Sequence, residues 1–203
     1  MADTVRGTTE AMMLAGPVWS IPLAGGRVEI PSSIDSIRAH LTGKRLAAFD
    51  AAVADTPAKH LLYVLLDHSL PADAEDLDPA TVARLRSGDF TGVLDDDGAP
   101  VIPSDPPPVD GELVPSVWTV DEYDGEPPTE FPSTIAGIRN GLAGEGLAEF
   151  AQEIGRTAAH HLALELFRWS YPAEQQAKDN HAFDRLAAQH DAPSTARQTR
   201  TGS

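Results

Sequence analysis

The sequence contains an internal repeat. Residues 31–73 align without a gap on residues 132–174 at a constant offset of 101, and eighteen positions are identical. Upstream, residues 18–21 align on residues 117–120 at an offset of 99. Most of the shared residues are apolar and recur at the spacing of buried helix faces, as in a repeated structural unit. The chain is therefore expected to fold as two copies of one small module.

Each copy begins with the pattern of a β-hairpin. The β-prone runs 18–21 and 27–30 flank a turn at 24–26, and Ser32 and Ser33 then offer hydroxyls that can cap a helix. Three helices are expected next, because apolar residues recur three or four places apart. The residues that predict them are Ile34, Ile37, Leu41, Leu46, Phe49, Val53, Ala58, Leu61 and Leu65, with their counterparts 101 positions later.

Glycine and proline set the expected ends of these helices. Gly43 and Gly144 separate the first helix from the second, and Pro71 and Pro172 end the third because proline cannot continue a helix. A last short helix is expected in each copy, around Val82 and Leu85 and around Phe183 and Leu186.

The expected fold is mainly α with a small β content (α+β), built as a tandem duplication of a hairpin with three or four short helices. A module of about 75 residues is only marginally stable alone, so the copies are expected to pack as a pseudo-two-fold pair. The expected order is a flexible N-terminus, a first module, an acidic Pro-rich linker, a second module and a disordered tail, at residues 1–16, 17–94, 95–114, 115–190 and 191–203.

The formal net charge of −16 is concentrated in one region. Residues 73–130 contain 16 acidic and two basic residues. Prolines and clustered carboxylates favour an extended chain at residues 95–114, and the carboxylates repel nucleic-acid phosphates, whose binding requires a basic surface. Two interpretations remain: a solvated linker, or a docking surface for a basic protein partner. In the second case the binding residues are Asp95, Asp96, Asp97, Asp121, Glu122 and Asp124.

Composition excludes several classes of protein. The chain has no Cys, so it cannot form a disulfide, a thiolate nucleophile or a Cys-based metal site. No apolar run approaches the roughly 18 residues that span a membrane, and residues 1–16 lack the pattern of a secretory signal. The 12 Arg residues against three Lys indicate a GC-rich genome. We therefore expect a cytoplasmic bacterial protein that does not bind a membrane.

No catalytic motif accompanies the repeat. There is no nucleophile elbow, no zinc-protease motif and no phosphate-binding Gly-rich loop. Residues 95–98 and 121–125 lack the spacing of an EF-hand, and His161 with Glu165 offers only two metal ligands. The expected third helices carry too few donors to read DNA bases as a helix-turn-helix does. No cofactor and no metal are expected.

A few polar and aromatic residues are candidates for a role. Those shared by both copies are Trp19, Arg38, His60, Trp118, Arg139 and His161. The tryptophans are expected in the core, the arginines beside a carboxylate and the histidines in a structural position at the module interface. Trp169 and Tyr171 replace His68 and Leu70 of the first copy. If only the second module has a binding face of its own, these two aromatic residues mark it.

A family resemblance rests on three short motifs. Ser-Ile-x-x-Ile-Arg-x-x-Leu (33–41), Leu-Ala-x-Phe (46–49) and a Leu-rich helix ending in Trp-Ser-Tyr-Pro (169–172) resemble short acidic helical proteins of high-GC bacteria. Those proteins are encoded beside small toxin genes and are regarded as antitoxins. The resemblance covers about 45 residues of each copy and implies a protein partner. It brings no catalytic residues.

The leading hypothesis is a non-enzymatic protein-binding module, acting as an antitoxin, inhibitor or scaffold, that docks a basic partner through acidic and apolar surface. Two alternatives remain. A nucleic-acid mimic would place its carboxylates in a phosphate-binding groove of its partner. A small-molecule enzyme or sensor would use a site between the modules at His60 and His161.

Overall fold

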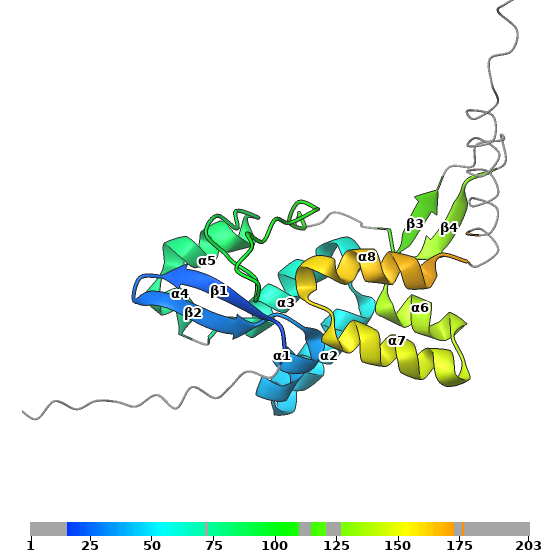
Figure 1. Cartoon of the computed structure of the whole chain (residues 1–203), viewed down its shortest axis with the longest axis horizontal. Helices are drawn as coiled ribbons and strands as arrows, with labels where there is room; N and C mark the ends of the chain where they lie inside the picture. Colours follow the sequence, from blue (N-terminus) through cyan, green and yellow to red (C-terminus); the bar gives the residue numbers. More distant parts are fainter. Residues whose placement is uncertain (1–15, 72, 110–114, 121–126, 173–175, 177–203) are drawn as a thin grey trace, which may run out of the picture. The chain divides into compact units, whose positions relative to one another are not determined.

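The computed structural model describes residues 16–71, 73–109, 115–120, 127–172 and 176. These residues form the mixed α+β structure that the sequence predicts, with short helices and small antiparallel hairpins (Figure 1). The described residues up to Ser170 belong to one compact unit, and a second unit begins at Tyr171.

The first half begins with the expected hairpin. Strand β1 (Val18–Leu23) pairs antiparallel with β2 (Gly26–Pro31), and Leu23 lies opposite Gly26 across a tight turn. Alternate residues of β1 point inward, so Trp19 and Ile21 are buried. The helices that follow are α1 (Ile34–His40), α2 (Gly43–Asp55), the short 3-10 helix η1 (Ala58–His60), α3 (Leu61–Ser69), α4 (Ala74–Leu77) and α5 (Pro79–Arg86).

The second half repeats this order of elements. They are β3 (Val117–Val120), β4 (Thr129–Pro132), α6 (Ile135–Gly141), α7 (Gly144–Arg156) and α8 (Ala159–Ser170). The bounds of α6 and α7 equal those of α1 and α2 shifted by 101 residues, and α8 spans the counterparts of η1 and α3. The last helix of the second copy, expected around Phe183 and Leu186, lies outside the described residues.

A glycine with positive φ stands at the start of the second helix in each half. The φ angle is +56° at Gly43 and +58° at Gly144. Side chains with a Cβ rarely adopt this left-handed backbone conformation, so the chain reverses there only because the residue is glycine. Both halves thus have a glycine at the position where the backbone requires one.

The two halves contact each other in reciprocal pairs. Helix α1 packs against α7, α2 packs against α6, and α3 packs against α8. The Ala58 N–H donates to the Ser133 carbonyl oxygen at 2.7 Å, and the Ala159 N–H donates to the Ser32 carbonyl oxygen at 2.8 Å. Each residue of the second bond is the 101-shifted counterpart of one in the first. Contacts of this kind have the form of an isologous interface.

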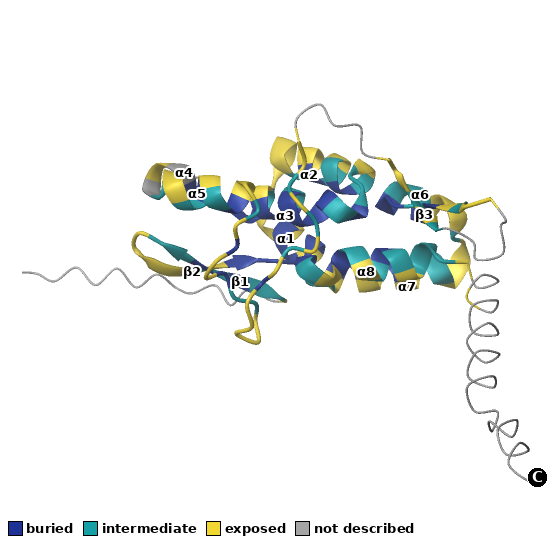
Figure 2. Ribbon diagram, turned by 90° about the horizontal axis from the view of Figure 1, so that it is seen from above, coloured by how far each residue is buried: buried dark blue, intermediate teal, exposed yellow. Residues whose placement is uncertain are grey.

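One hydrophobic core extends through both halves. Leu61 and Leu65 of α3 and Leu162 and Leu166 of α8 are fully buried and belong to the same cluster of apolar residues. Helices α4 and α5 lie beside the β1–β2 hairpin, and α3 and α8 lie between this hairpin and β3–β4 (Figure 1). Figure 2 shows buried residues concentrated where α1, α3 and α8 meet, and exposed residues along the outer faces. The halves are therefore not separately packed domains.

The described part of the acidic Pro-rich segment packs on the first half. Val101 is buried, and its N–H donates to the Val93 carbonyl oxygen at 3.1 Å. The Tyr63 hydroxyl donates to the Asp105 carbonyl oxygen at 2.8 Å. Residues 95–109 thus differ from the extended solvated linker that their composition predicts, because a few apolar side chains and backbone bonds attach them.

No helix of the described residues combines the length with the apolar character needed to cross a bilayer.

Candidate functional site

Helix α7 has one buried face and one acidic face. Phe150 and Ile154 are buried, whereas Glu145, Glu149 and Glu153 recur every fourth residue and are exposed. Residues four apart are neighbours on a helix surface, so the three carboxylates form one row. The aligned residues of α2 are Lys44, Ala48 and Ala52. The acidic row therefore belongs to the second half alone.

Trp169 lies in the last turn of α8, next to Glu153 at one end of this row. Its ring packs edge-on against Phe150, with centroids 5.4 Å apart, and it is half-buried. The indole Nε1–H donates to Glu153 Oε2 at 2.9 Å, which fixes the orientation of the ring. A half-exposed tryptophan with an anchored polar edge is a residue type enriched at protein interfaces.

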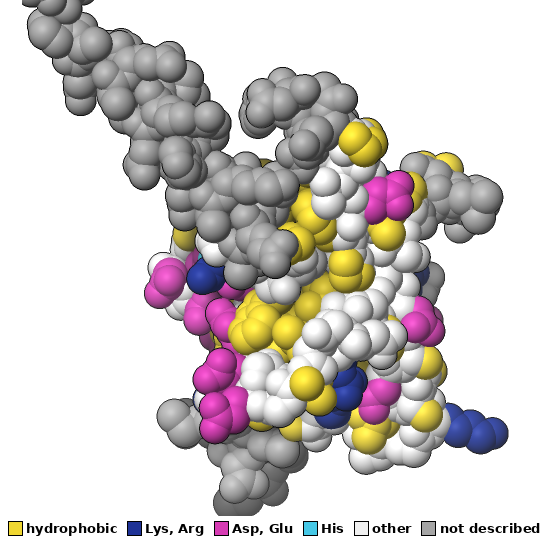
Figure 3. All heavy atoms as spheres, turned by 90° about the vertical axis from the view of Figure 1, so that its right-hand side faces the viewer, with side chains coloured by type: hydrophobic (Ala, Val, Ile, Leu, Met, Phe, Trp, Pro, Cys, Tyr) yellow, Lys and Arg dark blue, Asp and Glu magenta, His cyan; other side chains and the backbone are white. Residues whose placement is uncertain are grey.

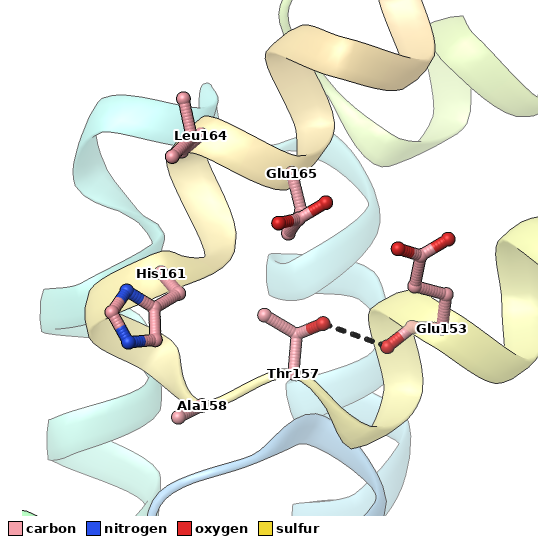
Figure 4. Close-up of a pocket in the computed structure, with 6 residues that line it drawn as sticks. All are labelled: Glu153, Thr157, Ala158, His161, Leu164 and Glu165. Carbon is pink, nitrogen blue, oxygen red and sulfur yellow. Dashed lines mark hydrogen bonds between the residues drawn. The ribbon is translucent and has the colours of Figure 1, made fainter.

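An open hollow of about 410 Å³ lies between α7 and α8 (Figure 4). Its lining residues are Glu153, Thr157, Ala158, His161, Leu164 and Glu165. Figure 4 shows Glu153 reaching it from α7 and Glu165 from α8. The Thr157 hydroxyl donates to the Glu153 carbonyl oxygen at 2.8 Å, and Glu165 pairs with Arg168 at 2.6 Å. Because Glu153 also holds Trp169, the hollow and the tryptophan are continuous. We call the acidic row, the hollow and Trp169 together the α7–α8 surface.

Two positions of this surface are buried in the first half. Leu164 is 62% exposed, whereas its counterpart Tyr63 is 7% exposed and contacts Phe90 and Asp105. His161 is exposed, whereas its counterpart His60 is buried. Tyr63 is less exposed than Leu164 because residues from 88 onward fold back over α3 and contact Tyr63. Leu164 is thus an exposed residue of the α7–α8 surface at a position where the first half covers the aligned Tyr63 with its own chain.

His160 connects the second half to the acidic segment. Its Nε2 lies 3.7 Å from Asp95 Oδ2, and its ring stacks on His161 with centroids 4.0 Å apart. Its Nδ1 is buried without a hydrogen-bond partner among the described residues. Burial lowers the pKa of His160 below its usual value and His161 adds to that effect, while Asp95 and Asp96 oppose it.

Of the acidic residues proposed from the sequence, the structure describes Asp95, Asp96 and Asp97, which lie in one turn. The side chain of Asp95 is 13% exposed and accepts backbone N–H bonds from Asp97 and Ala99, so it holds its own turn. Asp96 and Asp97 are exposed. The other three, Asp121, Glu122 and Asp124, lie outside the described residues.

Of the aromatic candidates, Trp19 is fully buried and contacts Phe90, whereas Trp118 is half-buried and packs edge-on against Phe167 with centroids 5.3 Å apart. Figure 3 shows apolar side chains gathered in the middle of the end of the molecule that carries β3 and β4, with acidic side chains along one border. Tyr171 is half-buried and belongs to the second unit.

The two shared arginines have different surroundings. The sequence predicts a carboxylate beside each of them, and Arg38 pairs with Asp50 at 2.9 Å and with Asp35 at 3.4 Å. The residues aligned with these two carboxylates in the second half are alanines, and Arg139 is exposed.

Some members of the α7–α8 surface were not singled out from the sequence. The spacing of Glu145, Glu149 and Glu153 is legible in the sequence, and its absence from the first copy was the available signal. Leu164 gives no such signal, because it continues the apolar pattern of its helix.

For metal binding, no group of three His, Asp or Glu residues within the described part of the chain is placed to hold an ion.

Comparison of the chain with protein-family models, with curated proteins and with solved structures found no match.

Proposed function

We propose that this chain is a non-enzymatic protein-binding module, antitoxin-, inhibitor- or scaffold-like, that docks a basic partner on the α7–α8 surface. The observation that carries the proposal is the exposed Leu164 at the hollow, where the first half buries the aligned Tyr63 under its own chain. An uncovered apolar residue and an anchored, half-buried tryptophan are side chains of the kind that partners bury.

The charge of the surface defines the chemistry of the partner. Glu145, Glu149 and Glu153 lie along one side and Glu165 lies in the hollow. Lys and Arg side chains on a partner would complement them, and this attraction speeds association more than it increases affinity. Leu164 and Trp169 favour the docking function over the nucleic-acid mimic. A phosphate-binding groove would offer these two side chains no apolar contact.

We also propose that the chain is a tandem duplication packed as a pseudo-two-fold pair. The constant offset of 101, the matching helix bounds and the reciprocal hydrogen bonds support it. In this view the first half covers Tyr63 with its own chain, and the second half leaves the aligned Leu164 exposed for binding.

Charge reversal tests the docking function. Full-length protein and the Glu145→Lys/Glu149→Lys variant serve as baits in a lysate of the source organism, with bound proteins quantified by mass spectrometry at low and high salt. We expect one stoichiometric basic protein on the wild-type bait, released by salt. The association rate of this protein with the variant should be roughly tenfold lower than with wild-type protein, because the long-range attraction is reversed.

The matched control is Glu29→Lys/Asp55→Lys, which makes the same charge change at two exposed residues of the first half. This control should retain the partner. Equal capture by the wild-type bait and the α7 variant would show that the acidic row does not dock a partner.

Trp169→Ala is expected to weaken binding of the captured partner by about 30-fold or more, because a desolvated interfacial tryptophan contributes about 2 kcal/mol or more. Isothermal titration calorimetry measures the change. Ile102→Ala, at a residue 77% exposed in the first half, is the apolar control. An unchanged Kd for Trp169→Ala would remove this residue from the interface.

A further inference from the structure

In the first half, a segment of the chain pairs with the outer edge of the hairpin. The Ser20 N–H of β1 donates to the Leu94 carbonyl oxygen at 2.8 Å, and the Leu94 N–H donates to the Ser20 carbonyl oxygen at 3.1 Å. The Arg27 guanidinium of β2 donates to the carbonyl oxygens of Ser20 and Gly92, at 2.6 Å and 2.9 Å. Residues 92–94 therefore lie along β1 on the side away from β2, as an added strand does.

The same segment covers the aromatic residues behind this edge. The Phe90 ring lies edge-on to Trp19, with centroids 6.3 Å apart, and edge-on to Tyr63, with centroids 6.2 Å apart. Trp19 is fully buried, and Tyr63, Phe90 and Val93 are buried as well. An aromatic residue four positions before the paired Leu94 thus connects the hairpin to α3.

The second half has the same edge, and no described segment pairs with it. Thr119 of β3 lies opposite Glu130 of β4. Ser20 lies opposite Glu29 in the same way, so the two hairpins share one register. In this register the backbone N–H and C=O of Thr119 point away from β4. Among the described residues β3 pairs with β4 alone, and such open edge groups are what an added strand binds.

The apolar residues behind this edge are less buried than their counterparts. Trp118, the counterpart of Trp19, is half-buried and packs on Phe167 of α8. Leu164, the counterpart of Tyr63, lies one turn before Phe167 on the same helix and is 62% exposed. Trp118 and Leu164 thus stand at the two positions that one aromatic residue connects in the first half.

The sequence does not repeat the covering segment. At the offset of 101, residues 90–94 align on residues 191–195, which read Asp-Ala-Pro-Ser-Thr, and neither Phe90 nor Val93 aligns on an apolar residue. Gly92 has a φ of +82°. The proline aligned with Gly92 cannot adopt this angle, because its ring fixes φ at about −65°. To repeat the arrangement of the first half, β3 therefore needs a segment from another molecule.

The charge of the second hairpin defines the chemistry of that segment. Residues 117–132 contain no Lys or Arg and five acidic residues, which are Asp121, Glu122, Asp124, Glu126 and Glu130. Pro128 aligns with Arg27, so the second hairpin lacks the cation that holds Gly92 in the first half. Lys and Arg side chains on the added segment would complement this charge.

We infer that the partner adds an extended basic segment to the outer edge of β3, pairs its backbone with Thr119, and places an aromatic side chain between Trp118 and Leu164. This inference rests on the proposed function, because Leu164 belongs to the α7–α8 surface. It specifies how the partner docks there: by strand addition, as residues 90–94 pair with β1 in the first half.

A defined peptide tests the inference on the full-length protein. The probe is a fluorescein-labelled peptide with the sequence of residues 88–96 carrying Asp89→Lys, Asp95→Lys and Asp96→Lys, and its binding is followed by fluorescence anisotropy. We expect saturable binding of this peptide. A second peptide that also carries Phe90→Ala should bind at least roughly tenfold more weakly, because the aromatic side chain is the buried anchor.

Thr119→Pro and Thr119→Val are the matched protein variants. Proline removes the outward N–H but leaves the bonds between β3 and β4, which use the neighbouring residues, whereas valine keeps the N–H. Thr119→Pro is expected to weaken binding of the basic peptide at least roughly tenfold, and Thr119→Val to leave it unchanged. Circular dichroism shows whether both variants keep the wild-type fold.

The inference is overturned if the basic peptide does not saturate, if both peptides bind equally, or if Thr119→Pro binds as wild-type does. It is also overturned if light scattering shows a dimer that Thr119→Pro dissociates, because a second copy then occupies the edge. Displacement of the probe by a peptide of residues 188–203 would overturn it too, because the chain's own C-terminal segment then fits the edge.

These outcomes are separable from the proposed function. If a partner is still captured through Glu145 and Glu149 after any of them, the docking function stands and only the strand addition is rejected. If the peptide binds as expected but wild-type and charge-reversed baits capture the same proteins, the proposed function fails.

Discussion

At the scale of single residues, the strongest local constraint lies at the start of α7. Gly144 has a φ of +58°, whereas Gly146 lies inside the helix with open space around it. Gly144→Ala is expected to lower the free energy of unfolding by about 1–2 kcal/mol because a Cβ strains left-handed backbone. Gly146→Ala is expected to raise it by about 0.5–1 kcal/mol, since alanine favours a helix. Urea unfolding of both variants measures the difference, and equal effects would contradict the backbone argument.

His160 gives the stability a predictable dependence on pH. Its pKa is lowered in the folded chain, mainly by burial, so the unfolded chain binds its proton more readily. The free energy of unfolding should therefore fall as the pH drops from about 6.5 towards the lowered folded pKa, and then become independent of this group. Besides His161, Asp95 and Asp96, the charged groups Lys59 and Asp105 line the cavity beside it.

The variant His160→Gln tests this dependence. Urea unfolding at about pH 7.5 and about pH 5.5 should show a smaller loss of stability for the variant than for wild-type protein, because the titrating group is gone. If both proteins lose the same free energy between the two pH values, the buried imidazole is not a source of the acid sensitivity.

At the scale of elements, helix caps differ in a way that can be measured. Ser33 caps α1: its hydroxyl accepts the Ser36 N–H at 3.3 Å, and the Ser36 hydroxyl accepts the Ser33 N–H at 3.1 Å. Thr42 stands at the same position before α2, yet its side chain makes no capping bond. Ser33→Ala should cost about 1 kcal/mol of stability and Thr42→Ala close to none. Thermal unfolding of both variants checks this, and a larger loss for Thr42→Ala would refute it.

The elements themselves were largely predictable from the sequence. Helix positions followed from apolar spacing interrupted at Gly43 and Pro71, and the hairpin followed from β-prone runs around a glycine turn, because these signals act over a few residues. The packing of residues 95–109 was not predictable in the same way. Composition indicated a solvated linker, and the contacts of Val101 and Tyr63 that attach it join residues far apart in sequence.

At the scale of the whole molecule, the shared core implies that both halves unfold together. Leu65 is fully buried where α3 packs against α8. Leu65→Ala is expected to cost about 2–5 kcal/mol, whereas Leu164→Ala, at an exposed residue, should cost about 0.5 kcal/mol or less. Hydrogen exchange followed by mass spectrometry should show loss of protection in α1 and α6 alike for Leu65→Ala. Protection that persists in α6 alone would mean that the halves are independent.

The candidate site was predictable only in its parts. Trp169 stood out because it replaces His68, and the row of Glu145, Glu149 and Glu153 could be found by comparing the copies. The hollow could not be found this way. Leu164 and Tyr63 are both apolar residues at one repeat position, and whether such a residue is exposed depends on what other chain segments cover it.

The sequence by itself determined the repeat unit, the order of hairpin and helices, and the glycines at which each second helix starts, since periodicity and backbone sterics operate locally. Only the tertiary structure decided that Tyr63 is covered while Leu164, at the aligned position, is exposed. That outcome depends on where residues 88–107 fold back, and this contact between distant segments leaves no period in the sequence. The proposed binding surface therefore became visible only when the two halves could be compared in space.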